Sequence, residues 1–213
     1  MKNIFKGKSV LVAGGTGMVG LPLTKKLKMM GAKVYVASLD RISSEQKKIL
    51  NKFYKIDLIN IQNCIKVTKN KDYVINLLGV TGSPKINYTN PGSFMMSNLY
   101  CAVNLLYASQ KNGVKRYLYT STYGVYGKKL AMKEENVWKD FPSNHDKYAG
   151  WAKRMGELQV EAYNKEFDFE GTMVESIERF IRGFGATQKP YFQLSKIRPK
   201  LLKPLIERKY NIR

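Results

Sequence analysis

The sequence predicts an α/β domain built on a doubly wound parallel sheet with helices on both faces. Short runs rich in Val, Ile, Leu and Tyr alternate along the chain with longer segments of helical periodicity. The first of these runs is apolar throughout rather than at every second position, which is typical of a strand buried on both faces. A glycine cluster connects this run to the helical segment that follows, as in a strand–loop–helix unit.

The first strand, the first helix and the second strand follow one another closely. Residues 8–13 contain the run Ser-Val-Leu-Val-Ala and are expected to form the first strand. Apolar residues then recur at helical spacing over residues 18–30, and Gly31 occupies the position where glycine commonly ends a helix. Residues 33–38, Lys-Val-Tyr-Val-Ala-Ser, predict the second strand.

The remaining elements continue the same alternation. They are strands at residues 53–56, 72–78 and 115–121, and helices at residues 92–112 and 147–167. Gly79 closes the fourth strand, and Gly113 stops the long helix after it. Alternating strands and helices place the crossover helices on the two faces of a parallel sheet.

The chain changes character after residue 170. Residues 170–185 are compatible with a helix or a strand. Residues 187–213 carry eight Lys or Arg, one acidic residue (Glu207) and three prolines. A chain of 213 residues suffices for one domain with a sizeable core. We therefore expect a single α/β domain over residues 1–186 and a basic tail over residues 187–213, which is draped on the surface or mobile.

Composition excludes several classes of protein. The hydrophobic share of 44% is that of a globular chain rather than a disordered one. No apolar run reaches the roughly 18 residues needed to span a bilayer, and the basic start has no apolar segment of a secretory signal. Cys64 and Cys101 are too few for a disulfide framework, and with one His they provide no metal-ligand cluster. We expect a cytoplasmic, reduced protein without metal or membrane.

The net charge of +21 has two explanations. A field this positive attracts nucleic acid, anionic membranes or phosphorylated small molecules. The lysines, however, are spread along the whole chain, and no basic helix or Arg-rich arm precedes residue 189. A compositional bias toward Lys, Asn and Ile is therefore favoured over a selected partner, and nucleic-acid binding through residues 187–213 is the less favoured alternative.

The glycine cluster predicts a nicotinamide dinucleotide site of the Rossmann type. Glycine lets the backbone turn tightly and approach a pyrophosphate, and the N-terminus of the next helix offers N–H groups and a positive dipole end. Gly20 allows the helix to pack closely on the strand. The residues expected to contact the dinucleotide here are Gly14, Gly15, Thr16, Gly17, Met18, Val19 and Gly20.

The spacing Gly-x-x-Gly-x-x-Gly resembles that of the extended branch of the short-chain dehydrogenase/reductase superfamily, which holds nucleotide-sugar epimerases, dehydratases and reductases. The run from Tyr119 to Gly127, Tyr-Thr-Ser-Thr-Tyr-Gly-Val-Tyr-Gly, is similar to the family's Ser-Ser-x-x-Val-Tyr-Gly after the fifth strand. The likeness covers roughly residues 8–186, with the motifs in the family's order.

The resemblance implies further cofactor contacts. Asp57, in Tyr-Lys-Ile-Asp-Leu, resembles the family's aspartate that meets the adenine ring, and Leu58 follows it. Leu78 and Gly79, in Ile-Asn-Leu-Leu-Gly-Val, resemble the segment that passes under the adenosine ribose. Asn98 resembles the asparagine on the long helix that buttresses the site.

The end of the second strand bears on the choice between NAD and NADP. The family's ribose-binding acid falls on Ser38, with Asp40 and Arg41 close behind. A carboxylate here favours the free 2′-hydroxyl of NAD, whereas Ser with a nearby Arg tolerates the 2′-phosphate of NADP. The sequence leaves both open and inclines slightly to NADP.

The catalytic residues are where the chain departs from the family. There a Tyr acts as acid/base, a Lys one helical turn later lowers its pKa and holds the nicotinamide ribose, and a Ser or Thr binds the reacting oxygen. The resemblance gives these last two roles to Lys153 and Thr122. Four residues before Lys153 stands Ala149, and the nearest Tyr is Tyr148, about 140° away on a regular helix. An irregular turn at Gly150 would restore a Tyr148–Lys153 pair; otherwise the usual acid/base is missing.

The resemblance implies NAD(P)-dependent epimerase, dehydratase or reductase chemistry on a nucleotide-sugar-like small molecule. It weakens at residues 179–186, a worn likeness of the family's Arg-Pro-x-Asn-Val-Tyr-Gly-Pro, and most of a C-terminal substrate domain is missing, so impaired activity is expected. The alternatives are a non-catalytic dinucleotide-binding subunit with a basic RNA- or partner-binding tail, and a gene remnant. The family's dimer interface implies a homodimer through residues 92–112 and 147–167.

Overall fold

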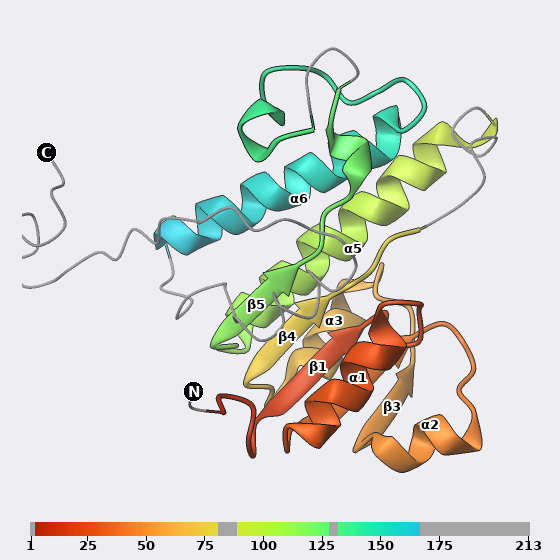
Figure 1. Ribbon diagram of the computed structural model, residues 1–213, viewed down its shortest axis with the longest axis vertical. Coiled ribbons are helices and arrows are strands. Elements are labelled where there is room, and N and C mark those ends of the chain that lie inside the picture. The colour runs from red at the N-terminus through yellow and green to blue at the C-terminus, as the bar shows by residue number, and fades with distance from the viewer. Residues whose placement is uncertain (1–2, 81–88, 128–131, 167–213) are drawn as a thin grey trace, which may run out of the picture. The chain divides into compact units, whose positions relative to one another are not determined.

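The computed structural model describes residues 3–80, 89–127 and 132–166 (Figure 1). All of them lie in the first of the two units into which the chain divides, Met1–Thr172. The segment at residues 170–185 and the basic tail expected at residues 187–213 lie outside the described residues.

Five parallel strands form the sheet of this unit. They are β1 (Ser9–Ala13), β2 (Lys33–Ser38), β3 (Lys52–Lys55), β4 (Tyr73–Asn76) and β5 (Arg116–Tyr119). Their order is β3-β2-β1-β4-β5, and each neighbouring pair is parallel. The chain winds from β1 to β3 on one side and returns to β4 on the other. Crossovers therefore leave in opposite directions at the carboxyl ends of β1 and β4, where such sheets open a crevice for a ligand.

Helices cover both faces of the sheet, as predicted. The five helices of the described residues are α1 (Gly20–Met29), α2 (Ser44–Ile49), α3 (Ile61–Thr68), α5 (Pro91–Lys111) and α6 (Lys147–Glu166). Two short 3-10 turns, η1 (Tyr123–Val125) and η2 (Glu134–Asn136), precede α6. Figure 1 shows α1 in front of the sheet and α3 behind it.

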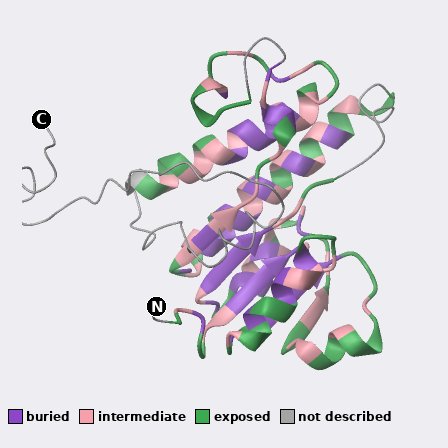
Figure 2. Ribbon diagram, in the orientation of Figure 1, coloured by how far each residue is buried: buried purple, intermediate pink, exposed green. Residues whose placement is uncertain are grey.

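The core continues on both sides of β1. Leu11 and Ala13 belong to a buried cluster with side chains of α3 and α5. Val10 and Val12 are also fully buried and, because successive side chains of a strand alternate, face the opposite side, which α1 covers. Figure 2 shows the central strands buried, whereas α2 is exposed or intermediate along its length. The continuous apolar run of β1 is thus explained by burial on both faces.

The predicted elements are confirmed, with ends that differ by at most two residues. Two short helices were not predicted from periodicity, because α2 has no buried residue and α3 spans only eight. Each has a capping signal instead: Ser43 and Gln46 form a capping box at α2, and the Asn60 side chain accepts from the Gln62 N–H, 2.8 Å, at α3.

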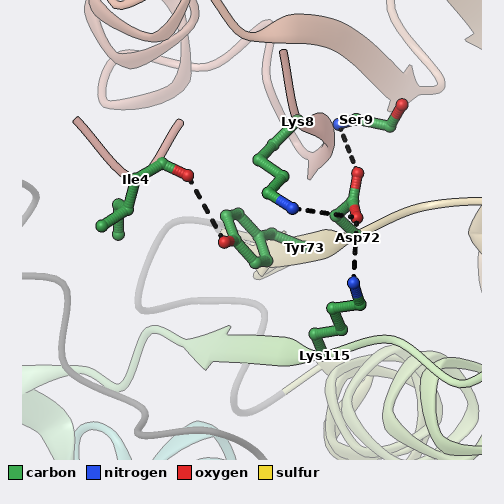
Figure 3. A network of polar contacts seen from close by, with 6 residues as sticks. All are labelled: Ile4, Lys8, Ser9, Asp72, Tyr73 and Lys115. Carbon is green, nitrogen blue, oxygen red and sulfur yellow. Dashed lines mark hydrogen bonds and ion pairs between the residues drawn. The ribbon is translucent and has the colours of Figure 1, made fainter. Parts of the chain in front are cut away.

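Asp72 joins three strands at the end of the sheet where they begin (Figure 3). One carboxylate oxygen accepts from the Ser9 N–H at 2.9 Å, and the other lies 3.8 Å from the Nζ atoms of both Lys8 and Lys115. The next residue, Tyr73, donates from its hydroxyl to the Ile4 carbonyl at 3.4 Å. The network fastens the starts of β1, β4 and β5 to one another.

We expect Asp72→Ala to lower the free energy of unfolding by about 1–2 kcal/mol, because the Ser9 N–H loses its acceptor. Asp72→Asn keeps an acceptor oxygen and loses only the half-exposed ion pairs, so about 0–1 kcal/mol is expected. Urea denaturation of both variants measures the difference. Equal losses in the two variants would show that the charge, not the hydrogen bond, carries the effect.

Candidate functional site

The glycine loop lies at the carboxyl end of β1. Gly14 has a φ of +77°, which favours glycine, and its N–H donates to the Ala37 carbonyl of β2 at 2.9 Å. The Gly17 N–H donates back to the Gly14 carbonyl at 3.1 Å. The chain therefore reverses tightly from strand to helix, which brings the start of α1 over the crevice.

Gly20, the first residue of α1, makes the closest approach in this loop. A Cβ atom there would lie 2.5 Å from the Gly14 carbonyl oxygen and 2.6 Å from the backbone of Gly15. A Cβ on Gly17, in contrast, would meet only that same oxygen, at 3.5 Å. Gly20 is thus required for packing the helix on the loop. Gly17, in contrast, has open space around its Cα atom.

The N-terminus of α1 is suited to an anion. Its N-cap residue, Val19, offers no side-chain acceptor to the first N–H groups, and its first turn contains no acidic residue. The Leu21 N–H already donates to the Gly17 carbonyl at 3.0 Å and Pro22 has no N–H, so the positive end of the helix dipole and the N–H groups of residues 18–20 are what the loop offers to a ligand. Met18 and Val19 are exposed beside them, at 88% and 37% of their full surface. A pyrophosphate fits this cradle.

Three polar side chains meet at the end of β2. The Thr16 hydroxyl lies 2.8 Å from the Ser38 hydroxyl and donates to an Asp40 carboxylate oxygen at 2.6 Å. The Ser38 hydroxyl also lies 3.1 Å from that oxygen. The Asp40 carboxylate is thereby held beside the glycine loop, while Arg41 is exposed.

The residues expected around the adenosine lie in two different settings. Asp57 is exposed, and its carboxylate accepts from the Ile59 N–H at 2.9 Å, whereas Leu58 is buried in the core cluster. Leu58 therefore supports the site through packing, and its side chain is not available to a ligand.

Asn98 of α5 fixes the segment after β4. Its side-chain oxygen accepts from the Val80 N–H at 3.0 Å, and its amide donates to the Phe94 carbonyl at 3.0 Å. Leu78, two residues before Val80, donates its N–H to the side-chain oxygen of Asn76 at 3.0 Å. These bonds fix the backbone on both sides of Gly79, and the role of Asn98 at a cofactor stays a prediction.

Lys153 of α6 reaches the carboxyl ends of two strands. Its Nζ donates to the Leu78 carbonyl after β4 at 2.7 Å and to the Thr120 carbonyl after β5 at 2.9 Å. The Nζ also lies 4.7 Å from the centre of the Tyr119 ring. The side chain is buried, and burial lowers the pKa of Lys153 to about 8, although nearby Cys101 and Glu157 act in the opposite direction.

Thr122 and Tyr148 were predicted to be catalytic together with Lys153. Thr122 is half-buried after β5, and its hydroxyl accepts from the Gly124 N–H at 3.4 Å. Tyr148 is half-buried in the first turn of α6, 5.7 Å from the Lys147 Nζ. Because α6 is α-helical from Lys147 onward, Tyr148 and Lys153 point in directions about 140° apart.

Two polar side chains of α6 were not predicted as part of this region. Arg154 is 1% exposed and donates to the Val125 and Asp140 carbonyls. Glu157 accepts a hydrogen bond from the Ser121 hydroxyl, and burial raises its pKa. A basic residue beside Lys153 has no sequence signal that distinguishes it from a surface Lys or Arg. The spacing Lys-x-x-x-Glu from Lys153 to Glu157 is the signal that could have found Glu157.

The depressed pKa of Lys153 leads to a pH-dependence of stability. Its pKa is about 8 in the folded chain and about 10.4 when unfolded. Between these values the unfolded chain binds more protons, so the free energy of unfolding rises with pH. From pH 7.5 to 9.5 we expect Lys153 to contribute an increase of about 1–2 kcal/mol. Urea denaturation across this range should show the increase in the wild type and not in Lys153→Met; equal slopes would contradict it.

None of the helices within residues 3–80, 89–127 and 132–166 is long and apolar enough to cross a membrane.

Comparison with known proteins identifies relatives of this chain. GDP-mannose 3,5-epimerase 1 of Oryza sativa subsp. indica is 29% identical over 170 residues, which cover 76% of this chain and 44% of that protein. GDP-mannose 3,5-epimerase of Arabidopsis thaliana is 28% identical over 171 residues, with the same coverage. The chain thus spans about half the length of the curated relatives it matches.

Solved structures agree with this relationship. The epimerase Mth375 of Methanothermobacter thermautotrophicus superposes with a TM-score of 0.64 at 27% identity, covering 78% of this chain and 50% of that one. The UDP-N-acetylglucosamine 4-epimerase of Methanobrevibacter ruminantium M1 superposes with a TM-score of 0.62 at 25% identity, covering 76% and 52%. The model of the NAD-dependent epimerase/dehydratase family matches residues 10–207. With its parallel sheet, its glycine loop and this match, the chain belongs to the NAD-dependent epimerase/dehydratase family.

Proposed function

We propose that this chain binds NAD across the carboxyl ends of β1 and β4 and carries out NAD-dependent epimerase, dehydratase or reductase chemistry on a nucleotide sugar. The observation that carries the proposal is the pairing of an uncapped glycine loop at α1 with a buried lysine that bridges the ends of β4 and β5. Both features face the switch point of the sheet, where ligands of such folds bind.

In this proposal the pyrophosphate lies on the glycine loop, Asp57 meets the adenine, and Lys153 holds the nicotinamide ribose. Bound NAD supplies a hydride acceptor. The Lys153 ammonium has three donors, of which two bind the Leu78 and Thr120 carbonyls, and the third would donate to a ribose hydroxyl. Thr122 would hydrogen-bond the reacting oxygen, and Tyr148 is the candidate acid/base.

The test is isothermal titration of the purified chain with NAD⁺, alongside Gly17→Asp as the disrupted loop and Gly92→Ala as the matched control. A Cβ at Gly92 meets nothing within 4 Å, so that variant should bind like the wild type. Gly17→Asp adds a carboxylate in front of the phosphates and should weaken binding at least about 100-fold. A wild-type chain that binds neither NAD⁺ nor NADP⁺ would refute the proposal.

We further propose a preference for NAD over NADP, against the slight inclination that Ser38 and Arg41 suggested in the sequence. The Asp40 carboxylate is held by Thr16 next to the loop and would accept a hydrogen bond from a ribose 2′-hydroxyl. The same carboxylate would repel a 2′-phosphate.

Asp40→Asn is expected to raise the affinity for NADP⁺ relative to NAD⁺ by about tenfold, because the repulsion disappears while the polar contact to Thr16 remains. Titration of both cofactors into wild type and variant measures the ratio. Arg41→Gln serves as the comparison: if that change, and not Asp40→Asn, alters the ratio, the preference depends on the exposed arginine.

A second candidate function is that of a non-catalytic dinucleotide-binding subunit. It is favoured by the regular start of α6, which turns Tyr148 away from Lys153. NAD⁺ binding without turnover of UDP-glucose, GDP-mannose or their 4-keto derivatives would support it. Turnover that is lost in Tyr148→Phe would favour the enzyme.

We also propose a homodimer through α5 and α6. Met96, Tyr100 and Tyr107 form an exposed apolar stripe along one side of α5, and Leu158 is exposed on α6, which packs against α5. Light scattering on the full chain should give twice the monomer mass, and Tyr100→Lys should reduce it. Nucleic-acid binding through residues 187–213 stays a prediction from the sequence, because those residues lie outside the described structure.

A further inference from the structure

Arg154 is the largest side chain among those fully buried in the described part of the chain. Its Nε donates to the Val125 carbonyl at 3.0 Å, and one terminal nitrogen donates to that oxygen and to the Asp140 carbonyl, the latter at 2.7 Å. A guanidinium buried on main-chain carbonyls is costly to desolvate, so the arrangement calls for an explanation beyond filling space.

The guanidinium also lies between the only two tryptophans of the chain. Its central carbon is 5.3 Å from the Trp151 ring centre and 5.5 Å from that of Trp138. Trp151 in turn lies 5.9 Å from the ring of Phe141. Arg154 therefore joins the helix α6 to residues on both sides of η2, which a compact ammonium could not do, because only the planar fork can donate to two carbonyls while it lies against two aromatic faces.

Consecutive residues of α6 hold the two ends of one segment. Lys153 binds the carbonyl of Thr120, Arg154 binds that of Val125, and Thr122 lies between these two points. The helix approaches this segment closely, since a Cβ on Gly150 would lie 2.3 Å from the Gly124 carbonyl oxygen. The position of Thr122 relative to Lys153 is thus set by the two cations together.

We propose that Arg154 is a positioning residue that holds residues 120–125, and with them Thr122, against Lys153. The inference rests on the proposed function, in which Thr122 and Lys153 face the substrate and the nicotinamide ribose. Arg154 itself is buried and touches neither. It acts by keeping the Thr120 carbonyl within reach of the Lys153 ammonium.

The test compares Arg154→Met and Arg154→Lys with Lys139→Met, which removes an exposed cation between Trp138 and Asp140. Nitrogen-15 NMR of lysine-labelled protein follows the titration of the Lys153 ammonium, whose signal is assigned with Lys153→Arg. The other titratable groups beside it, Cys101, Glu157 and Tyr119, are unchanged in every variant. Tryptophan fluorescence and its quenching by acrylamide report whether the Trp138–Arg154–Trp151 contact is broken.

In Arg154→Met the titration of Lys153 should move upward by at least about one pH unit, toward that of an exposed lysine, because residues 120–125 move away and admit water to the ammonium, and this hydration outweighs the loss of the Thr120 carbonyl. Arg154→Lys should give the same change to a smaller extent, and Lys139→Met none. If the tryptophans become exposed while the Lys153 titration stays unchanged, Arg154 has only a structural role and the proposal is wrong.

Should Arg154→Met fail to fold, Arg154→Lys decides by the same two readouts, with a normal Lys153 titration counting against the proposal. Titration of NAD⁺ separates this inference from the function on which it rests. Absence of NAD⁺ binding in the wild type refutes the proposed function, whereas the Lys153 signal still reports on Arg154 without any ligand. Retained NAD⁺ binding in a variant whose Lys153 titration has moved supports both.

Discussion

Replacing Gly20 with alanine is expected to abolish NAD⁺ binding and to destabilise the domain. The new Cβ would lie 2.5 Å from the Gly14 oxygen and 2.6 Å from two backbone atoms of Gly15, none of which is the end of a flexible side chain. Relief requires moving α1 away from β1, at a cost of about 1–3 kcal/mol. The same movement takes the N–H groups of α1 away from the phosphates, so the dissociation constant for NAD⁺ should rise at least about 100-fold.

Two other glycines make matched controls for this prediction. A Cβ on Gly17 would make only an ordinary contact, so Gly17→Ala should keep its stability and lose affinity, since the methyl would occupy the space proposed for the phosphates. Gly92→Ala should keep both, because Gly92 is exposed in α5 and has open space around it. Thermal unfolding and isothermal titration distinguish the three. A Gly20→Ala variant that binds NAD⁺ like the wild type would contradict the packing argument.

Moving the tyrosine of α6 by one residue is expected to raise turnover at least tenfold. In the double variant Tyr148→Phe/Ala149→Tyr the phenol stands four residues before Lys153, about 40° from it around the helix instead of about 140°. Ala149 is half-buried on the side of the helix that Lys153 shares. A positioned acid/base is typically worth about 10²–10⁴ in rate. The assay is NAD-dependent conversion of a panel of nucleotide sugars.

The single variant Tyr148→Phe separates the two explanations of any wild-type activity. If Tyr148 is the acid/base despite its direction, its loss should lower the rate at least about 100-fold, and the double variant should not recover it. If Tyr148 is not used, Tyr148→Phe should be silent and the double variant should gain activity. NAD⁺ affinity should stay within about twofold in both variants, because the glycine loop is formed by other elements. A loss of NAD⁺ binding would mean that position 149 does not tolerate the larger ring.

The central strands β1 and β4 were predicted to within two residues because burial on both faces leaves an apolar run in the chain itself. The ends of the strands were harder to predict from the sequence. The strand expected over residues 72–78 ends at Asn76, because the Leu78 N–H turns to the side chain of Asn76 instead of to a neighbouring strand. The helices α2 and α3 escaped the periodicity argument since each is short, and the Ser43–Gln46 capping box was the signal that would have found α2.

The candidate site likewise has parts that could be predicted from the sequence and parts that could not. The glycine loop could be predicted from the sequence because its requirements are local. Gly14 has a positive φ, and Gly20 can have no side chain because it lies against the backbone of Gly14, only six residues earlier. The tyrosine displaced from its expected place could also be counted along the helix.

What the sequence by itself determined is therefore the fold class, the glycine loop between β1 and α1, and the place of Lys153 on α6, since each could be read from patterns along the chain. Only the tertiary structure decided what these side chains bind. Asp40 is held by Thr16 from 24 residues away, Arg154 by Val125 from 29, and Lys153 by Leu78 from 75. Parallel strands bring such distant residues to one edge of the sheet, and each of these partners contributes a carbonyl or hydroxyl that almost any residue of its kind could offer. No local pattern records that choice.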